Sequence, residues 1–189
     1  MKRLVPLIIG GLLATTVTPT ASAAADGPRS SGVAVTVARF ATPDTATKAY
    51  TYDPALIAPG AAVMVVATPL RHSTKTLLSV YGLVPNRTYG AHAHQLPCGV
   101  APTDSGAHHQ HVVDPNQPSV DPAYANPENE IWLDFTTDDR GRAVVGTVVP
   151  WQFADRRAGS VVIHAQRTAT EPGKAGTAGA RVGCATVKF

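Results

Sequence analysis

Five of the seven histidines in this 189-residue chain lie between positions 92 and 111, in the segments GAHAHQLPC (90–98) and GAHHQH (106–111). His92 and His94 are two residues apart in a run with strand composition, so their side chains should point to the same face of a strand. Neutral imidazoles are favoured ligands of zinc and copper. The pair predicts two metal ligands on one rigid element, and a plain pair of surface or core histidines is the alternative.

A further histidine, His164, lies in the apolar run VVIHAQ (161–166). A lone histidine in such a strand is more often a hydrogen-bonded core residue than a ligand. The other residues of the pattern favour a ligand role for His164. They are the HxH pair, the loop histidines His108, His109 and His111, and a cysteine near each end of the arrangement, Cys98 and Cys184.

The segments that must position these residues have the composition of short β-strands separated by Pro, Gly and Asn. None shows sustained helical periodicity. We expect an all-β fold, an immunoglobulin-like Greek-key β-sandwich or barrel of about eight antiparallel strands. The segments 84–88 and 138–141 have the composition of hairpin turns. Residues 130–137 resemble a strand, whereas Leu96 to Asn129 has no strand pattern and predicts a long functional loop.

The N-terminus has the layout of a secretory signal peptide, with Lys2 and Arg3 before a short apolar run and small residues up to Ala23. We expect a signal peptide at 1–23, a flexible segment and first strand at 24–39, and a single domain at 40–189. Loss of the two cations lowers the formal charge from +3 to +1, so charge predicts neither a nucleic-acid nor a membrane partner. No later run is apolar enough for a membrane span.

In an oxidising extracytoplasmic space, two cysteines most simply form a disulfide, Cys98–Cys184. Closing a loop of that length would stabilise the fold by roughly 4–5 kcal/mol on the chain-entropy model.

Two stretches resemble the copper-zinc superoxide dismutases: YGLVPNRTYGAHAHQLPCGVAPTDSGAHHQH (81–111), with its HxH pair, loop cysteine and loop histidine, and VVIHAQRTATEPGKAGTAGARVGCATV (161–187). The resemblance implies that His92, His94 and His164 are copper ligands. It implies that His108 is the loop ligand that bridges the two metals in the family, with His109 or His111 as alternatives if the loop is shifted. Arg181 matches the arginine beside the substrate, and the two cysteines match the family's disulfide.

The chain departs from the family at the zinc site. Glu128 and Ile131 stand where the family has its last zinc histidine and its aspartate, and Ile131 cannot ligate a metal. The loop between His164 and Arg181 is also short. These departures resemble the copper-only branch of the superfamily, so we expect copper without zinc. Because ligating imidazoles normally donate their second N–H to an acceptor, Glu128 or Glu130 is expected to hold His108.

The resemblance implies a secreted superoxide dismutase that converts superoxide to dioxygen and hydrogen peroxide, with catalytic roles for Arg181 and His108. A non-catalytic copper-binding or copper-buffering module outside the cytoplasm is the alternative, and an inert secreted domain is a third interpretation. The sequence leaves the oligomeric state open.

Overall fold

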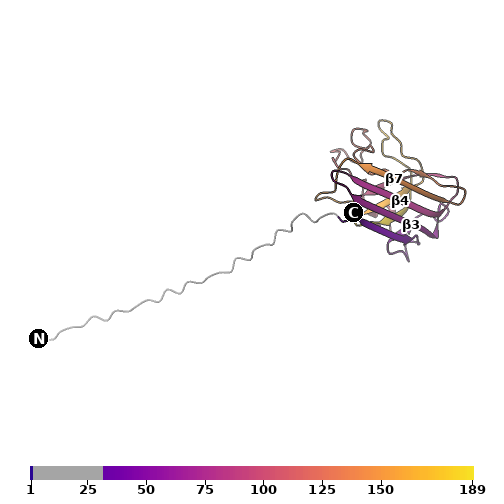
Figure 1. Cartoon of the computed structure of the whole chain (residues 1–189), viewed down its shortest axis with the longest axis horizontal. Coiled ribbons are helices and arrows are strands. Elements are labelled where there is room, and N and C mark those ends of the chain that lie inside the picture. Colours follow the sequence, from indigo (N-terminus) through magenta and orange to yellow (C-terminus); the bar gives the residue numbers. More distant parts are fainter. Residues whose placement is uncertain (2–31) are drawn as a thin grey trace. The chain divides into compact units, whose positions relative to one another are not determined.

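Residues 32–189 form two antiparallel β-sheets that enclose a shared apolar core (Figure 1). This computed structural model describes Met1 and residues 32–189, so the predicted signal peptide and residues 24–31 lie outside the described residues. Within the described part, no helix has the length and hydropathy needed to cross a membrane. The expected all-β sandwich is confirmed, with nine strands among residues 32–189 where about eight were predicted.

The first sheet has four strands in the order β1-β3-β4-β7, three of which lie side by side in Figure 1. Its strands are β1 (Ala34–Arg39), β3 (Ile57–Pro69), β4 (Thr74–Leu83) and β7 (Arg142–Val149). β3 and β4 form a hairpin closed by the bond from Leu70 N to Ser73 O (2.8 Å). This sheet supplies one wall of the core.

The second sheet has five strands in the order β2-β9-β8-β5-β6 and carries His92, His94 and His164. Its strands are β2 (Ala49–Thr51), β5 (Thr88–His94), β6 (Phe135–Thr136), β8 (Ser160–His164) and β9 (Arg181–Thr186). The chain crosses between the sheets after β1, β2, β4, β6 and β7. β4 thereby pairs with β7 although β5 and β6 lie between them in the sequence, which gives a Greek-key connectivity.

The core arises from period-two burial in the first sheet. Along β3, Val63, Val65 and Ala67 point inward and are buried, while the residues between them face outward. Burying a side chain of this size contributes roughly 1.5–3 kcal/mol. β5 and β8 differ, because they are buried on both faces. Loops cover their outer face and enclose the histidines of β5 and β8.

Neither predicted hairpin turn joins two strands of the same sheet, so both hairpin predictions are wrong. Residues 84–88 lead from β4 to β5, which lie in different sheets, and residues 138–141 lead from β6 to β7, which also lie in different sheets. The turn at 138–141 is real locally, because Asp138 N donates to Arg142 O at 2.8 Å. Turn composition predicts a chain reversal, whereas the partner of each strand depends on packing across the sandwich.

The predicted strand at 130–137 is mostly irregular. Only Phe135 and Thr136 form a strand, while Glu130 and Trp132 make isolated bridges to Gln110 and His92. The apolar residues of this run are nevertheless core residues, since Ile131 and Leu133 are fully buried. Leu96 to Asn129 is a long loop, as expected, with one 3-10 turn, η1 (Pro102–Ser105).

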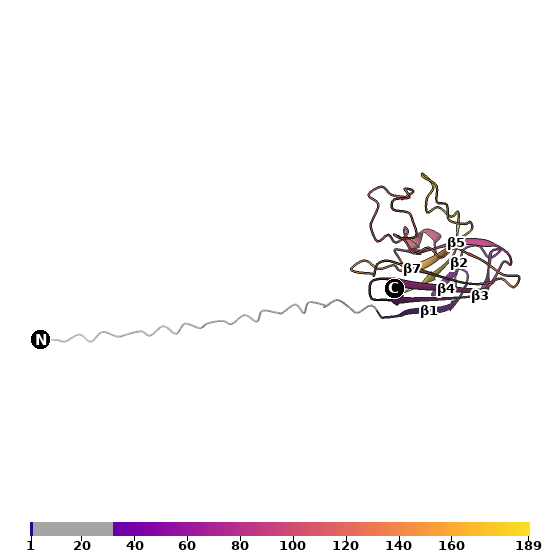
Figure 2. The same ribbon diagram turned by 45° about the horizontal axis from the view of Figure 1, so that its top comes forward.

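Two long loops rise from the same side of the sandwich (Figure 2). One follows β5 and the other follows β8, and they meet where Gly173 N donates to Val120 O at 3.1 Å. The Cys98–Cys184 disulfide, with an S–S distance of 2.06 Å, ties the first loop to β9. The predicted disulfide is therefore present.

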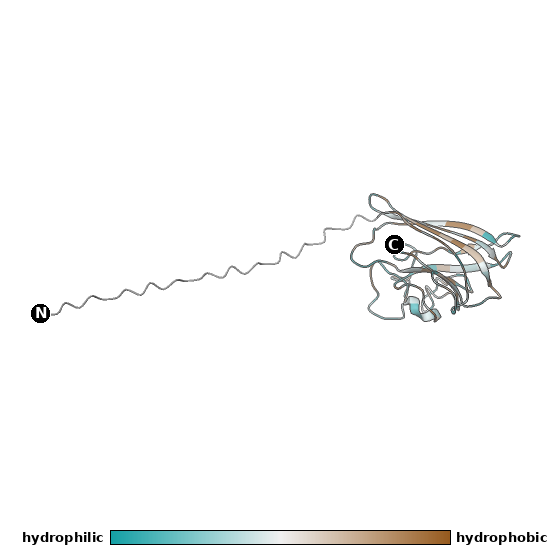
Figure 3. Cartoon of the chain, turned by 90° about the horizontal axis from the view of Figure 1, so that it is seen from below, coloured by the Kyte–Doolittle hydropathy of each residue, from teal (hydrophilic) through white to brown (hydrophobic). Residues whose placement is uncertain are grey.

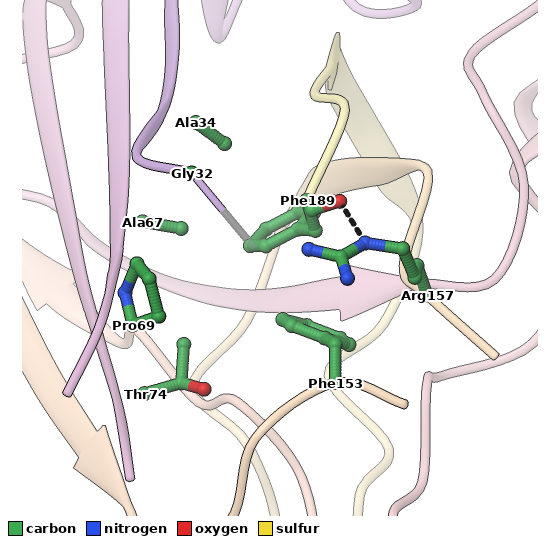
Figure 4. Close-up of a pocket in the computed structure, with 8 residues that line it drawn as sticks. All are labelled: Gly32, Ala34, Ala67, Pro69, Thr74, Phe153, Arg157 and Phe189. Atoms are coloured by element: carbon green, nitrogen blue, oxygen red, sulfur yellow. Dashed lines mark hydrogen bonds between the residues drawn. The ribbon is translucent and has the colours of Figure 1, made fainter. Parts of the chain in front are cut away.

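The far end of the core is closed by aromatic packing (Figure 4). The rings of Phe153 and Phe189 lie 5.2 Å apart, and Arg157 Nε donates to the carbonyl oxygen of Phe189. The cavity between these residues and β1 has a volume of about 10 Å³. It has room for one water molecule at most, so it is a packing feature rather than a binding site.

Candidate metal centre

His92 and His94 project from the outer face of β5, where the loops bury both completely. β8 pairs with β5 so that His164 lies opposite Gly90. Gly90 has no room for a side chain, because a Cβ there would lie 2.7 Å from Gln166 O and 2.8 Å from the Cβ of Ala178. The glycine therefore lets the loop after β8 pack closely over β5 and brings His164 to the HxH pair.

Four histidines converge at this point: one nitrogen from each of His92, His94, His108 and His164 lies within 4.8 Å of the corresponding nitrogen of the other three. His108 reaches the group because it forms an isolated bridge with His94. The structure therefore brings together all four residues that the sequence indicated as metal ligands.

The ring orientation of His94 and of His164 follows from their hydrogen bonds. His94 Nδ1 is 2.9 Å from Gly106 O, and His164 Nδ1 is 3.2 Å from Gly179 O. A carbonyl oxygen only accepts, so Nδ1 carries the proton in both rings and Nε2 carries a lone pair. These two Nε2 atoms lie 3.4 Å apart. Two lone pairs facing each other at this distance fit a cation bound by both.

His92 is turned the other way round. Its Nε2 lies 2.7 Å from the hydroxyl of Thr168, which itself donates to Asp134 Oδ1 at 2.7 Å. Because the hydroxyl proton is used on Asp134, the hydroxyl accepts from His92 Nε2–H. Nδ1 of His92 is then a buried acceptor without a hydrogen-bond partner among the described residues. An unpaired buried nitrogen is costly unless a metal binds it.

Burial keeps these imidazoles neutral, which is the form that binds metals. Burial, with the neighbouring His108 second, lowers the pKa of His92 and of His94 well below the ordinary value. Burial also lowers the pKa of His164 to about 4. At neutral pH His92, His94 and His164 therefore offer neutral nitrogen ligands, and the residues present fit a copper or zinc ion.

Glu130 is the acid that holds His108. Its Oε2 accepts from His108 Nδ1 at 2.8 Å and from Trp132 Nε1 at 2.7 Å, and its Oε1 accepts from Gln110 Nε2 at 2.8 Å. Glu130 is 1% exposed, so these three donors supply the hydrogen bonds that its buried oxygens need. Of the two expected acids, Glu128 is exposed and Glu130 makes the bond.

The other loop histidines lie outside the cluster. His109 packs against Phe153 with ring centroids 5.0 Å apart, and burial lowers its pKa to about 4. His111 stacks on Trp151 at 5.0 Å with parallel rings. Of the three loop histidines that the sequence left open, His108 is the one that reaches the other ligands.

Arg181 stands at the entrance of the site. It lines a cavity of about 390 Å³ together with His108 and His164. Its Nη1 donates to Pro102 O and to Ser105 Oγ, both at 3.0 Å. These bonds fix the guanidinium beside the cluster, where it can attract and orient a small anion.

Sequence reasoning missed the residues that orient the ligands: Asp134, Thr168, Trp132 and Gln110. An acid within the apolar run WLDF was a signal for Asp134, because buried carboxylates are rare unless paired. Thr168 gave no signal, since one threonine in a polar loop resembles any other. Its contact with His92 spans 76 residues and depends on the packing of the loop after β8 over β5.

The chain matches no family model, and no curated protein matches it in sequence. Its structure matches a Cu/Zn superoxide dismutase from Brucella abortus with a TM-score of 0.50 and 17% identity, over 82% of this chain and 99% of that one. It matches the clock protein EA4 with the same TM-score and identity, over 82% of this chain and 93% of that one. The chain has the superoxide dismutase fold. Within it, the four histidines come from β5, from the loop after β5 and from the end of β8.

Proposed function

We propose that this protein is a secreted superoxide dismutase that holds copper with His92, His94, His108 and His164. The observation that carries the proposal is the inward-facing set of lone pairs: the facing Nε2 atoms of His94 and His164, and the orphaned Nδ1 of His92. A set of imidazole nitrogens suits Cu(II), which stands highest in the affinity order of divalent metals for such ligands.

Copper bound there would supply one-electron exchange with superoxide, oxidising one molecule to dioxygen and reducing a second, with two protons, to hydrogen peroxide. The chain's own residues provide the rest. Arg181 attracts the anion through its charge and its N–H groups. His108 donates its Nδ1–H to Glu130, so Nε2 is the nitrogen left for copper and, whenever it is not bound to copper, the atom that can take up a proton and pass it to the product.

The proposal includes copper without zinc. Three features support it: Ile131 is buried in the core, His109 and His111 pack against aromatic rings, and Glu130 occupies the outer nitrogen of His108. In the two-metal enzymes of the family that nitrogen faces zinc. Here the Glu130 carboxylate accepts a hydrogen bond from this nitrogen and orients the ring.

Secretion is the proposed setting. The Cys98–Cys184 disulfide supports it, because such bonds persist in oxidising compartments. The signal-peptide pattern at 1–23 adds to this.

The alternative is a non-catalytic copper-binding protein, which the same four ligands would also support. Measuring superoxide decay separates the dismutase from the copper-binding protein. The samples are the copper-loaded protein, its Arg181→Ala variant and, as a control, its Arg140→Ala variant, because Arg140 is an exposed arginine at the 138–141 turn. A dismutase predicts fast decay that slows about tenfold or more in Arg181→Ala and is unchanged in Arg140→Ala. If all three proteins bind one copper and none accelerates superoxide decay, the result favours the non-catalytic copper-binding protein.

A further inference from the structure

The segment from Glu130 to Asp134 runs beside β5 with one face toward the core. Ala93 N of β5 donates to Ile131 O at 3.1 Å. Two residues on, Leu133 N donates to Ala91 O at 2.7 Å. Ile131 and Leu133 are fully buried in the apolar core, whose strands carry brown residues in Figure 3. Since successive side chains of an extended chain point to opposite sides, the residues that alternate with them face away from the core.

The three alternate side chains, Glu130, Trp132 and Asp134, lie against the candidate ligands. Glu130 accepts from His108, and Asp134 accepts from the hydroxyl that is bonded to His92. Trp132 lies between the two acids in the sequence and forms an isolated bridge with His92. Its ring meets that imidazole edge-on, with centroids 5.7 Å apart. Each acid has a hydrogen-bonding role at the site, whereas the role of the indole is unassigned.

The indole shares one carboxylate oxygen with a ligand. Trp132 Nε1 lies 2.7 Å from Glu130 Oε2, and His108 Nδ1 lies 2.8 Å from the same atom. The other oxygen, Oε1, accepts from Gln110 Nε2. Two N–H groups that donate to one oxygen draw on the same negative charge, so each bond is weaker than it would be alone. The indole therefore limits how strongly Glu130 attracts the Nδ1 proton of His108.

We propose that Trp132 raises the reduction potential of the bound copper by weakening the hydrogen bond between His108 and Glu130. The inference rests on the proposed copper site and does not require dismutase activity. A carboxylate that accepts the N–H of a ligating imidazole makes that ring a more basic ligand. A more basic ligand stabilises Cu(II) relative to Cu(I), which lowers the potential. The indole opposes this effect, because it donates to the same oxygen. Hydrogen bonds around the ligands are one of the means by which a protein adjusts the potential of a metal.

A purely structural role for Trp132 would depend on its ring, which packs against His92. The proposed role depends on its N–H group instead. Phenylalanine separates the two, because it keeps an aromatic ring at this position and removes the donor. Trp132 is partly exposed, so the smaller ring leaves no closed cavity in the core.

The test is the Cu(II)/Cu(I) potential of the copper-loaded protein, measured by spectroelectrochemistry after its copper content has been determined. Trp132→Phe should favour Cu(II) over Cu(I) about tenfold more than the wild type does, which is a fall of about 59 mV for a one-electron couple. Trp151→Phe is the matched control and should keep the wild-type potential. Trp151 donates its indole N–H to Glu128 O at 2.8 Å and stacks on His111, outside the cluster.

A double-mutant cycle identifies the route of the effect. In Glu130→Ala the indole has no carboxylate to donate to, so adding Trp132→Phe should leave the potential unchanged. With copper bound, an unshifted or higher potential in Trp132→Phe would overturn this inference alone. An equal fall in the Glu130→Ala background would also overturn it, because the effect would then come from the ring. A wild type that binds no copper would overturn the copper site and this inference together.

Discussion

Oε2 of Glu130 lies 2.8 Å from Nδ1 of His108 and 2.7 Å from Nε1 of Trp132. One carboxylate oxygen therefore orients a candidate ligand and an indole whose ring lies 5.7 Å from that of His92. This contact connects the loop histidine to the irregular segment after it and sets which nitrogen of His108 faces the cluster.

Replacing Glu130 by alanine should lower copper affinity about 10- to 100-fold, because the ligating ring loses the acceptor that fixes its tautomer. Glu130→Gln should lose less, since the amide oxygen can still accept from Nδ1. Competitive titration against a copper chelator measures both. Glu128→Ala is the control and should bind like the wild type, because Glu128 is exposed. Equal affinity in Glu130→Ala and Glu128→Ala would refute this role.

Thr168→Val should alter the site at His92. The valine has nearly the same shape but removes the acceptor of Nε2–H and the hydroxyl donor to Asp134. The imidazole can then adopt the other tautomer, so the Cu(II) EPR parameters should shift and the affinity should fall about tenfold. Thr168→Ser should restore both. Thr170→Val, at an exposed position in the same loop, should leave the spectrum unchanged.

The Cys98→Ser/Cys184→Ser double variant should lose roughly 4–5 kcal/mol of unfolding free energy on the chain-entropy model, because it removes a cross-link between positions 86 residues apart. Urea denaturation monitored by tryptophan fluorescence measures the change. The wild type in excess reductant should match the variant. A loss below about 1 kcal/mol would show that the disulfide contributes little to the fold.

Gly90→Ala should destabilise the fold by about 1–3 kcal/mol, because the added methyl group meets the backbone oxygen of Gln166 and the side chain of Ala178. It should also weaken copper binding, since the collision displaces the loop that begins at His164. Gly32→Ala is the control, because nothing lies within 4 Å of a Cβ there. Urea denaturation and copper titration on the same samples measure the two effects. Wild-type unfolding free energy and wild-type copper affinity in Gly90→Ala would contradict this account.

The all-β class and the HxH pair could be predicted from sequence for physical reasons, whereas the choice of His108 and His164 as ligands rested on the resemblance to the copper-zinc superoxide dismutases. Strand alternation is local, and the HxH spacing places His92 and His94 on one face without knowledge of the fold. Glu130 was one of two candidates because it lies near the ligands in sequence. Thr168 and Gly90 could not be found, since their roles depend on contacts across the sandwich that no local pattern encodes.

The hairpin errors have the same origin. The turns at 84–88 and 138–141 were recognised from composition, but whether a turn joins partners in one sheet or crosses to the other depends on how the two sheets pack. Likewise, the segment around Ile131 and Leu133 was recognised as apolar, yet it is core without regular strand pairing.

The most direct test is stopped-flow decay of superoxide with protein that carries one copper per chain and no zinc. We predict many turnovers per chain, with the activity lost when copper is removed and absent from His164→Ala. Decay no faster than in buffer, with copper still bound by all four histidines, would contradict the dismutase assignment.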